Sequence, residues 1–335
     1  MKKQKTKNIV IIIIIIFLKN SFCEDAAGFD FLNLPVSARS AGIGNISLIG
    51  ESANVLAMRG NPAMLSEIKN NAVEIDFAPI ILDVYSGALS GVIVLQNGLV
   101  VVPSIFYISF GTTDAVDENG DKLNLEIAPF SLSVDCAASY RFFERLSSGI
   151  RIKFVFEQIA KRTIYWDNIY CGAFALDLGI FSDYKALRYS AGLRNAGFSF
   201  DNYENINVKL PVSAFVAVGA ILQKEAKIEW FLECEKYLYD YMFFRTGFEI
   251  PVFRDVLILR TGTIFSPNDV KNFFGTFGKS SKKSWEYSGE NWILATVGAT
   301  INAKIKNELL SIDIACQFRK DGIRPGLSFS GTMYF

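Results

Sequence analysis

The sequence of 335 residues contains no histidine. Histidine is the side chain whose charge changes near neutral pH, and it is the commonest metal ligand in proteins. Its absence removes the usual general base for a serine or cysteine nucleophile. The sequence also shows no nucleophile elbow, no phosphate-binding loop and no cluster of side chains with metal-ligand spacing. We therefore predict a protein that is not an enzyme and that needs neither a cofactor nor a metal.

Paired cysteines are missing as well. The five cysteines are scattered, and Cys136, Cys171, Cys234 and Cys316 lie far apart in the sequence. A disulfide framework or a zinc site normally places cysteines in close pairs. These four residues are therefore expected to serve as small apolar side chains.

An excess of charge of either sign is also absent, because 34 Lys and Arg balance 34 Asp and Glu. Nucleic-acid binding requires Lys and Arg clustered on one surface, so no nucleic-acid partner is predicted. The chain is instead rich in apolar residues, with a mean hydropathy of +0.26, 29 Phe and 13 Tyr. Aromatic residues at this level suit β-strands and the belts at a membrane interface.

The first residues have the pattern of a secretory signal peptide. Four lysines precede the apolar run Ile9 to Leu18, and the small residues Ser21 and Cys23 allow a cut before Glu24. A signal-anchor helix is the competing interpretation, but the run of about ten residues is short of the roughly twenty that span a bilayer. Lipid modification of Cys23 is a lesser alternative. Residues 1–23 are therefore predicted to be removed on export.

Beyond the signal, no apolar run is long enough for a membrane helix, so a membrane location would require a closed β-barrel. The later sequence alternates with a period of two. Ile150, Ile152 and Phe154, for example, alternate with Arg151 and Lys153. Successive residues of a strand point to opposite faces, so such segments have one apolar and one charged face.

About fourteen such strands are predicted, an even number as in single-chain bacterial barrels. The predicted strands are 71–79, 83–95, 98–110, 123–139, 148–160, 169–181, 187–197, 211–221, 226–237, 241–250, 255–265, 291–303, 309–319 and 325–335. A soluble β-sandwich would show the same alternation. The signal, the strand lengths, the loop lengths and the last residue together favour a transmembrane barrel formed by residues 71–335.

The predicted connections alternate in length. Outer-membrane barrels have short periplasmic turns and longer external loops. The predicted periplasmic turns are 96–97, 140–147, 182–186, 222–225, 251–254 and 304–308. The intervening connections include the long ones, 112–122, 161–168, 198–210 and 266–290. The last of these is the most polar, which favours an external position.

The final strand places Leu327, Phe329, Met333 and Phe335 on one face. A terminal aromatic residue on a lipid-facing strand is the ending that outer-membrane barrels present to their assembly machinery. Phe335 is therefore predicted to be an assembly signal. Outer-membrane lipid and the barrel-assembly machinery are the expected partners, in a cell outer membrane of the Gram-negative type.

Residues 36–65 are rich in Gly, Ala, Ser and Asn and carry motifs of a known family. Arg39, Gly42 and Gly44 are followed by Gly60 and by Asn61 to Leu65, which read N-P-A-M-L. Later segments continue the match, namely 192–197, 210–211, 228–235, 245–249 and 259–262. Together they resemble the PorV/PorQ family within the wider FadL-like outer-membrane barrels.

The resemblance implies a barrel of fourteen strands with an N-terminal hatch, residues 24–70, folded into the lumen as a plug. FadL-type proteins move hydrophobic small molecules, such as fatty acids, inward through the barrel wall. The leading hypothesis is such uptake, with the hatch as gate. The alternative is a PorV-like accessory that binds exported proteins of a secretion system at the cell surface, and a further alternative is a structural barrel.

Two sets of residues are candidates for the functional interior. The candidate ligand or gating residues of the hatch are Arg39, Gly42, Gly44, Asn54, Arg59, Asn61 and Pro62. The charges predicted to face the lumen are Glu126, Arg151, Lys153, Arg194, Glu229, Glu233, Arg245, Glu249, Arg260 and Asp313. These charges are interpreted either as ion pairs that hold the hatch or as a polar tunnel. Unpaired buried charges are costly, which favours ion pairs in which Arg39 and Arg59 meet wall carboxylates.

Asn61 and Pro62 have two interpretations. They lie in the motif that matches the family best, which suggests a functional role. An Asn-Pro-Ala sequence is equally ordinary turn chemistry, in which Asn caps the turn and Pro fixes φ. The turn interpretation is preferred.

Overall fold

A computed structural model describes residues 28–48, 55, 57–117, 121–161, 169–200, 208–223, 225–238, 242–253, 256–267, 293–306, 308–319 and 325–335. The predicted signal peptide, Asn54 and almost all of the predicted loop 266–290 lie outside these residues. Within the part of the chain that is described, no helix combines the length and the apolar character needed to cross a membrane.

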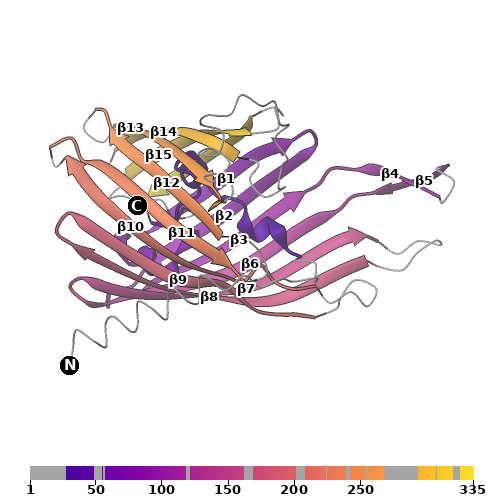
Figure 1. Cartoon of the computed structure of the whole chain (residues 1–335), viewed down its shortest axis with the longest axis horizontal. Helices are drawn as coiled ribbons and strands as arrows, with labels where there is room; N and C mark the ends of the chain where they lie inside the picture. Colours follow the sequence, from indigo (N-terminus) through magenta and orange to yellow (C-terminus); the bar gives the residue numbers. More distant parts are fainter. Residues whose placement is uncertain are drawn as a thin grey trace, which may run out of the picture.

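Fourteen strands form a closed antiparallel barrel, so the predicted fold class and strand number are confirmed (Figure 1). Consecutive strands of the barrel pair with each other, β3 with β6 among them, and β1 closes the barrel against β16. The strands are β1 (Ala72–Ile81), β2 (Val84–Val94), β3 (Val100–Ser109), β6 (Phe130–Phe143), β7 (Leu146–Ala160), β8 (Ile169–Tyr184), β9 (Leu187–Phe200), β10 (Ser213–Gln223), β11 (Ile228–Tyr237), β12 (Met242–Pro251), β13 (Leu257–Phe265), β14 (Ile293–Ile305), β15 (Glu308–Arg319) and β16 (Gly326–Tyr334).

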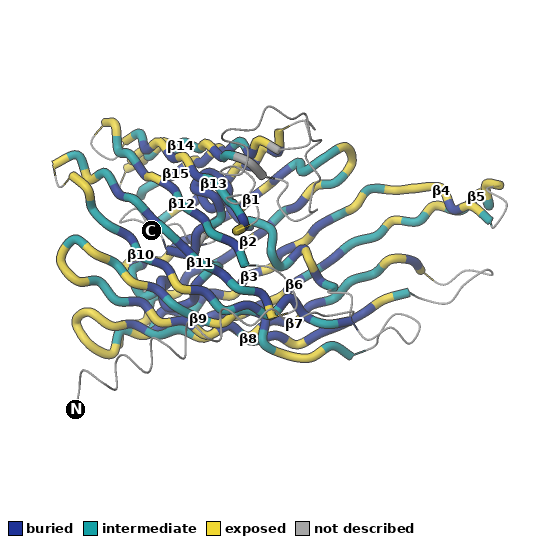
Figure 2. Tube along the Cα trace, viewed as in Figure 1, coloured by how far each residue is buried: buried dark blue, intermediate teal, exposed yellow. Residues whose placement is uncertain are grey.

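The period-two pattern separates the two faces of the wall. Ile152 is 59% exposed on the outside, whereas its neighbour Arg151 is 1% exposed on the inside. Burial alternates in the same way along most of the wall (Figure 2). The outer face is therefore an apolar surface, and the polar residues of the strands point into the barrel.

The two ends of the barrel differ in the length of their connections. At one end, here called the turn end, the strands are joined by residues 95–99, 144–145, 185–186, 224–227, 252–256 and 306–307. At the other, the loop end, lie the longer connections 110–129, 161–168, 201–212 and 266–292. The short connections fall where the sequence predicted them.

One predicted strand, 123–139, is wrong. The structure divides it into β5 (Lys122–Ile127) and β6, and β5 pairs only with β4 (Thr113–Val116) in a separate two-stranded sheet. This hairpin projects beyond the loop end (Figure 1). Pro129 lies between the two strands and has no N–H to donate to a ladder. The β3–β6 ladder begins just after it, at Ser109 opposite Phe130.

Residues 28–48, 55 and 57–68, here called the lumen segment, lie inside the barrel. Its elements are η1 (Asp30–Asn33), α2 (Ala38–Gly42), η2 (Ala57–Gly60) and η3 (Pro62–Glu67). The helix α2 contacts β13 to β16, whereas η3 contacts β6, β7 and β8. These two groups of strands lie on opposite sides of the barrel, so the segment crosses the lumen.

The packed interior has three layers along the barrel axis. Near the turn end, Leu48, Val55 and Leu65 belong to an apolar cluster with wall residues such as Val100. Near the loop end, Phe29 and Phe31 belong to a second apolar cluster with Phe106, Ala173 and Leu210. The charged side chains of the wall lie between these two clusters.

Candidate functional site

The helix α2 is short, small and fully enclosed. Ser37 caps it by accepting a hydrogen bond from the Ser40 N–H at 3.2 Å. The Ala38 N–H donates to Ser330 Oγ at 2.7 Å and to Asp76 Oδ2 at 3.1 Å, both on the wall. All five residues of α2 are buried. The first turn of the helix is therefore hydrogen-bonded to β1 and β16.

The predicted hatch glycines serve close packing. A Cβ on Gly42 would lie 3.0 Å from the Cα of Gly298 on β14, which is too close for an ordinary contact. Gly44 has a φ of +84°, a conformation that residues with a side chain seldom adopt. The two glycines let the backbone of the lumen segment touch the wall.

Arg39 connects α2 to a chain of charged side chains on the wall. Its Nη2 donates to both carboxylate oxygens of Glu249 at 2.8 Å. Glu249 Oε2 also accepts from Arg260 Nε at 3.2 Å, and Arg260 Nη1 donates to Asp313 at 3.0 Å. Three predicted lumen charges, from β12, β13 and β15, thus form one chain of contacts that ends at the arginine of α2.

A second ion-pair cluster lies on β9, β11 and β12. Arg245 Nη1 lies 3.0 Å from Glu233 and also contacts Glu235, and Arg194 contacts the same two carboxylates. The lumen segment joins the cluster, because the Ser47 N–H donates to Glu233 at 2.7 Å. Arg194 Nε also donates to the Gly60 carbonyl at 2.8 Å.

A third cluster surrounds Arg59 on β6, β7 and β8. Arg59 Nη2 lies 2.6 Å from Asp135, and Arg151 lies 3.3 Å from the same carboxylate. Lys153 Nζ lies 2.6 Å from Asp177. Lys153 also donates to Asn195 Oδ1 at 2.7 Å.

Asn61 and Pro62 act as a turn that is fitted to the wall. Asn61 caps η3 by accepting from the Ala63 N–H at 2.9 Å, and Pro62 begins that helix. The Asn61 side chain also donates to the Ile180 carbonyl at 3.1 Å and to Ser190 Oγ at 2.7 Å. A Cβ on Gly179 would lie 1.8 Å from Asn61 Oδ1, so β8 needs glycine at this contact.

Glu229, another predicted lumen charge, pairs with Arg188 at 3.2 Å. The prediction that Glu126 faces the lumen is wrong. Glu126 is exposed on β5, opposite Asp114 in the projecting hairpin, and does not face the lumen. The alternation was real, but it belonged to a sheet outside the barrel. The other predicted lumen charges are paired within the wall or with the lumen segment. Among the residues described, no group of three or more Cys, Asp and Glu is placed to hold a metal.

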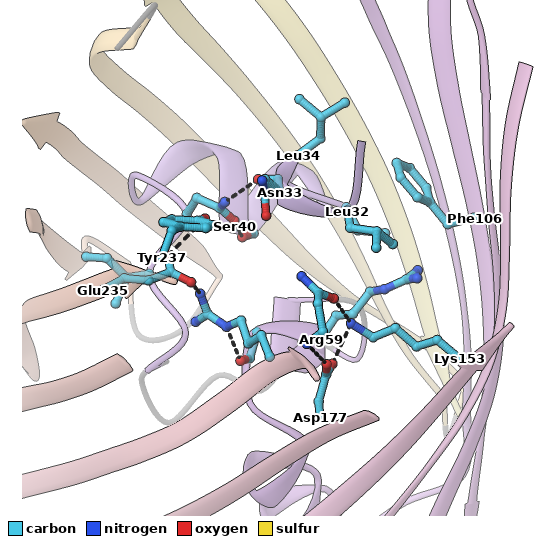
Figure 3. Close-up of a pocket in the computed structure, with 16 residues that line it drawn as sticks. Leu32, Asn33, Leu34, Ser40, Arg59, Phe106, Lys153, Asp177, Glu235 and Tyr237 are labelled. Carbon is cyan, nitrogen blue, oxygen red and sulfur yellow. Dashed lines mark hydrogen bonds and ion pairs between the residues drawn. The ribbon is translucent and has the colours of Figure 1, made fainter. Parts of the chain in front are cut away.

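The space left in this polar layer is small. A cavity of about 50 Å³ lies between the lumen segment and the wall, lined by Lys153 and Asp177 on one side and by Glu235 and Tyr237 on the other (Figure 3). Leu32, Asn33 and Leu34 of the lumen segment also line it (Figure 3). Ion pairs and the lumen segment fill most of this layer, which favours the ion-pair interpretation over a polar tunnel.

The pairing between the first and the last strand is incomplete near the loop end. The β1–β16 ladder runs from Ala72 opposite Tyr334 to Phe77 opposite Phe329 and stops there. Both strands continue, β1 to Ile81 and β16 from Gly326. Residues 78–81 and 326–328, here called the seam, therefore face each other without a ladder between them.

An apolar cavity of about 220 Å³ lies at the seam, and we call it the seam cavity. Ala78, Ser86, Gln317 and Ser328 line it from the inner face of the wall, Pro79 and Leu327 from the outer face, and Leu34 and Pro35 from the lumen segment. The lining residues thus come from both faces of the wall and from the lumen segment, at the point where the β1–β16 ladder stops.

Sequence reasoning missed the seam cavity. Its signal was Pro79, because proline inside a strand marks an edge that lacks one hydrogen-bond donor. Phe335 lies beside the other end of the β1–β16 ladder, where its N–H donates to the Asn71 carbonyl at 3.0 Å. Its side chain is 61% exposed, on the outer face that it shares with Phe329 and Met333.

No protein-family model and no curated protein matches the sequence. Solved structures do match. The toluene transporter TodX of Pseudomonas putida is 12% identical, with a TM-score of 0.57 over 93% of this chain and 98% of that one. The CymD monoaromatic hydrocarbon channel is 10% identical, with a TM-score of 0.58 over 92% and 97%. A FadL homologue from Pseudomonas aeruginosa is 9% identical, with a TM-score of 0.50 over 89% and 98%. The chain thus has the fold of FadL-like outer-membrane barrels, and the narrower resemblance to PorV/PorQ proteins stays a prediction.

Proposed function

We infer that the protein is an outer-membrane channel for the uptake of hydrophobic small molecules. The seam cavity is the observation that carries this proposal. It is lined mainly by apolar residues, which belong to both faces of the barrel wall, and it lies where the β1–β16 ladder is interrupted. Small-molecule sites are usually apolar concave spaces with a few polar groups, which describes this cavity.

The filled lumen supports a lateral route. Buried ion pairs hold the lumen segment to both sides of the wall through Arg39 and Arg59. An apolar molecule that crossed this layer along the axis would have to separate charges in a low-dielectric interior, which costs several kcal/mol per ion. A passage from the seam cavity through the wall to the bilayer avoids that cost.

The orientation follows from the connections. Because outer-membrane barrels keep their short turns in the periplasm, we place the turn end there and the loop end outside the cell. The seam then lies toward the external side of the membrane. A hydrophobic molecule would enter from the loop end, occupy the seam cavity and leave sideways into the lipid.

Two structurally similar proteins are described as a toluene transporter and a monoaromatic hydrocarbon channel, which supports the same class of cargo. The alternative, an accessory that binds exported proteins at the cell surface, needs no apolar cavity that reaches the lipid-facing side of the wall. We therefore prefer uptake.

Filling the seam cavity tests the proposal. Ala78 is buried and lines the cavity, so Ala78→Phe places a ring in that space. We expect at least a tenfold fall in the uptake of radiolabelled ethylbenzene and acetophenone by Gram-negative host cells that express the full chain. Val134 is exposed on the outer face of β6, so Val134→Phe places the same ring outside the cavity and should leave uptake unchanged.

Both variants are first checked for heat-modifiable mobility on a gel, which reports a folded barrel. Uptake that is equal in wild-type, Ala78→Phe and empty-vector cells would contradict the proposed channel. A folded Ala78→Phe protein with full channel-dependent uptake would show that the seam cavity is not the route.

A further inference from the structure

Gln317 lines the seam cavity, and its side-chain amide N–H is left without a hydrogen-bond partner in the described part of the buried wall. It is 8% exposed, on the inner face of β15. Its Nε2 is buried and has no hydrogen-bond partner among the residues described. A buried amide donor without a partner is costly, and native proteins seldom retain one without a reason.

The position of this amide is fixed by the wall. Gln317 lies opposite Gly326 in the β15–β16 ladder and opposite Thr296 in the β14–β15 ladder. It therefore lies between the paired part of the barrel and the open seam. A polar group on a strand held from both sides is better suited to selecting a ligand than one on a loop.

The charge of the cavity lining narrows the class of ligand. Among the described residues that line the seam cavity, none is Lys, Arg, Asp or Glu. A carboxylate or an ammonium in this space would have no opposite charge beside it, and an unpaired ion is strongly disfavoured in an apolar site. The ligand that fits is neutral.

The volume of the seam cavity limits the size of the ligand. A cavity of 150 Å³ lined by apolar residues holds benzene. The seam cavity, at about 220 Å³, has room for a single ring with a short substituent. The hydroxyl groups of Ser86 and Ser328, which line the same space, add polar atoms near the amide.

We propose that the seam cavity selects neutral, mainly apolar molecules that carry one hydrogen-bond acceptor, and that Gln317 Nε2 is the donor that recognises it. The inference rests on the proposed uptake function and deepens it, because a channel for pure hydrocarbons gains nothing from an amide donor. An ester, ketone or ether oxygen would accept a hydrogen bond from this unpaired donor. A hydrocarbon of the same size would leave it unpaired.

The test compares ligands of one shape. The purified full chain in lipid nanodiscs is titrated with acetophenone, ethylbenzene and phenylacetate by ligand-observed NMR, with empty nanodiscs subtracted. One neutral hydrogen bond corresponds to an affinity difference of about fivefold to tenfold. We expect acetophenone to bind more tightly than ethylbenzene by that factor and phenylacetate not to bind.

Gln317→Met keeps the length of the side chain and removes the amide. We expect it to bind acetophenone and ethylbenzene equally, because only the acceptor preference depends on Nε2. Gln158→Met, on β7 across the barrel, is the matched control and should keep the wild-type preference. The ratio of the two affinities is the readout, so a general loss of packing does not imitate the result.

The outcomes separate the two proposals. Equal binding of acetophenone and ethylbenzene by the wild-type protein, or a preference that survives in Gln317→Met, would overturn the role of Gln317 and leave hydrophobic uptake intact. A failure of both neutral compounds to bind would overturn this inference together with the seam cavity as an uptake site.

Discussion

Arg39 joins the lumen segment to the wall through a buried ion pair. It is the second residue of α2, and its guanidinium contacts both oxygens of Glu249. Both side chains are nearly inaccessible, with exposures of 2% and 5%. Removing one partner of such a pair leaves a buried charge that is only partly compensated.

Arg39→Met is therefore expected to lower the free energy of unfolding by about 3 kcal/mol, the low end for breaking a buried pair, because Arg260 still contacts Glu249. The measurement is denaturant unfolding in detergent. Combined with Glu249→Gln it forms a double-mutant cycle, and the two losses should not add.

The control pair is Arg188 and Glu229, which joins β9 to β11 near the turn end, with exposures of 14% and 5%. Arg188→Met is expected to cost less than Arg39→Met, because water reaches Arg188 and weakens its pairing. If Arg39→Met were no more destabilising than Arg188→Met, the anchoring role of Arg39 would be wrong.

The sequence was sufficient to predict which strand residues point inward, because alternation alone determines it. Arg151, Lys153 and Glu233 were predicted in this way, and each is buried. The sequence could not predict which charges meet. Arg39 and Glu249 are separated by 210 positions, and their contact depends on how the lumen segment crosses the barrel.

At the level of elements, the hairpin of β4 and β5 is the part that the sequence misassigned. The predicted strand 123–139 joined two segments of the same period that belong to different sheets. Pro129 indicates a change of register in this pattern, but a register change and a change of sheet give the same local pattern. The partner strand β4 has only four residues, too few for a clear alternation.

The hairpin is held by its own contacts. Lys122 donates to Asp114, and this hydrogen bond raises the pKa of Lys122. The pair is exposed, so it adds little to stability. The fourteen-strand ladder does not include either strand.

Replacing residues 112–128 by a short Gly-Ser turn should therefore leave the barrel intact. We expect the same heat-modifiable mobility and the same ethylbenzene uptake as in the wild-type protein, because the paired strands and the seam cavity are unchanged. Uptake is measured in host cells beside the Ala78→Phe variant. A loss of uptake with a folded barrel would show that the hairpin, and not the wall alone, takes part in the passage.

At the level of the whole molecule, closing a fourteen-stranded barrel forces the first strand to pair with the last. That closure is complete toward the turn end and stops at Phe77 and Phe329. The sequence predicted the barrel from its strands, but an incomplete ladder is a property of two strands more than 240 positions apart. Pro79, which has no N–H to donate, lies just beyond the last pair of this ladder. Local sequence patterns do not show that it lies opposite β16.

The measurement that tests the central claim most directly is uptake through a seam that can be closed and reopened. Continuing the register beyond Phe77 and Phe329 places Ala78 opposite Ser328. The variant carries Ala78→Cys and Ser328→Cys, with Cys136, Cys171, Cys234 and Cys316 replaced by Ala. Its control carries Val73→Cys and Met333→Cys, which face each other where the ladder is already formed.

Oxidation with copper phenanthroline should stop hydrophobic uptake by the Ala78→Cys and Ser328→Cys protein, and dithiothreitol should restore it. The Val73→Cys and Met333→Cys protein should take up the same compounds in both states. Disulfide formation in both proteins is verified on non-reducing gels. Full uptake with the seam disulfide closed would contradict the lateral route through the wall.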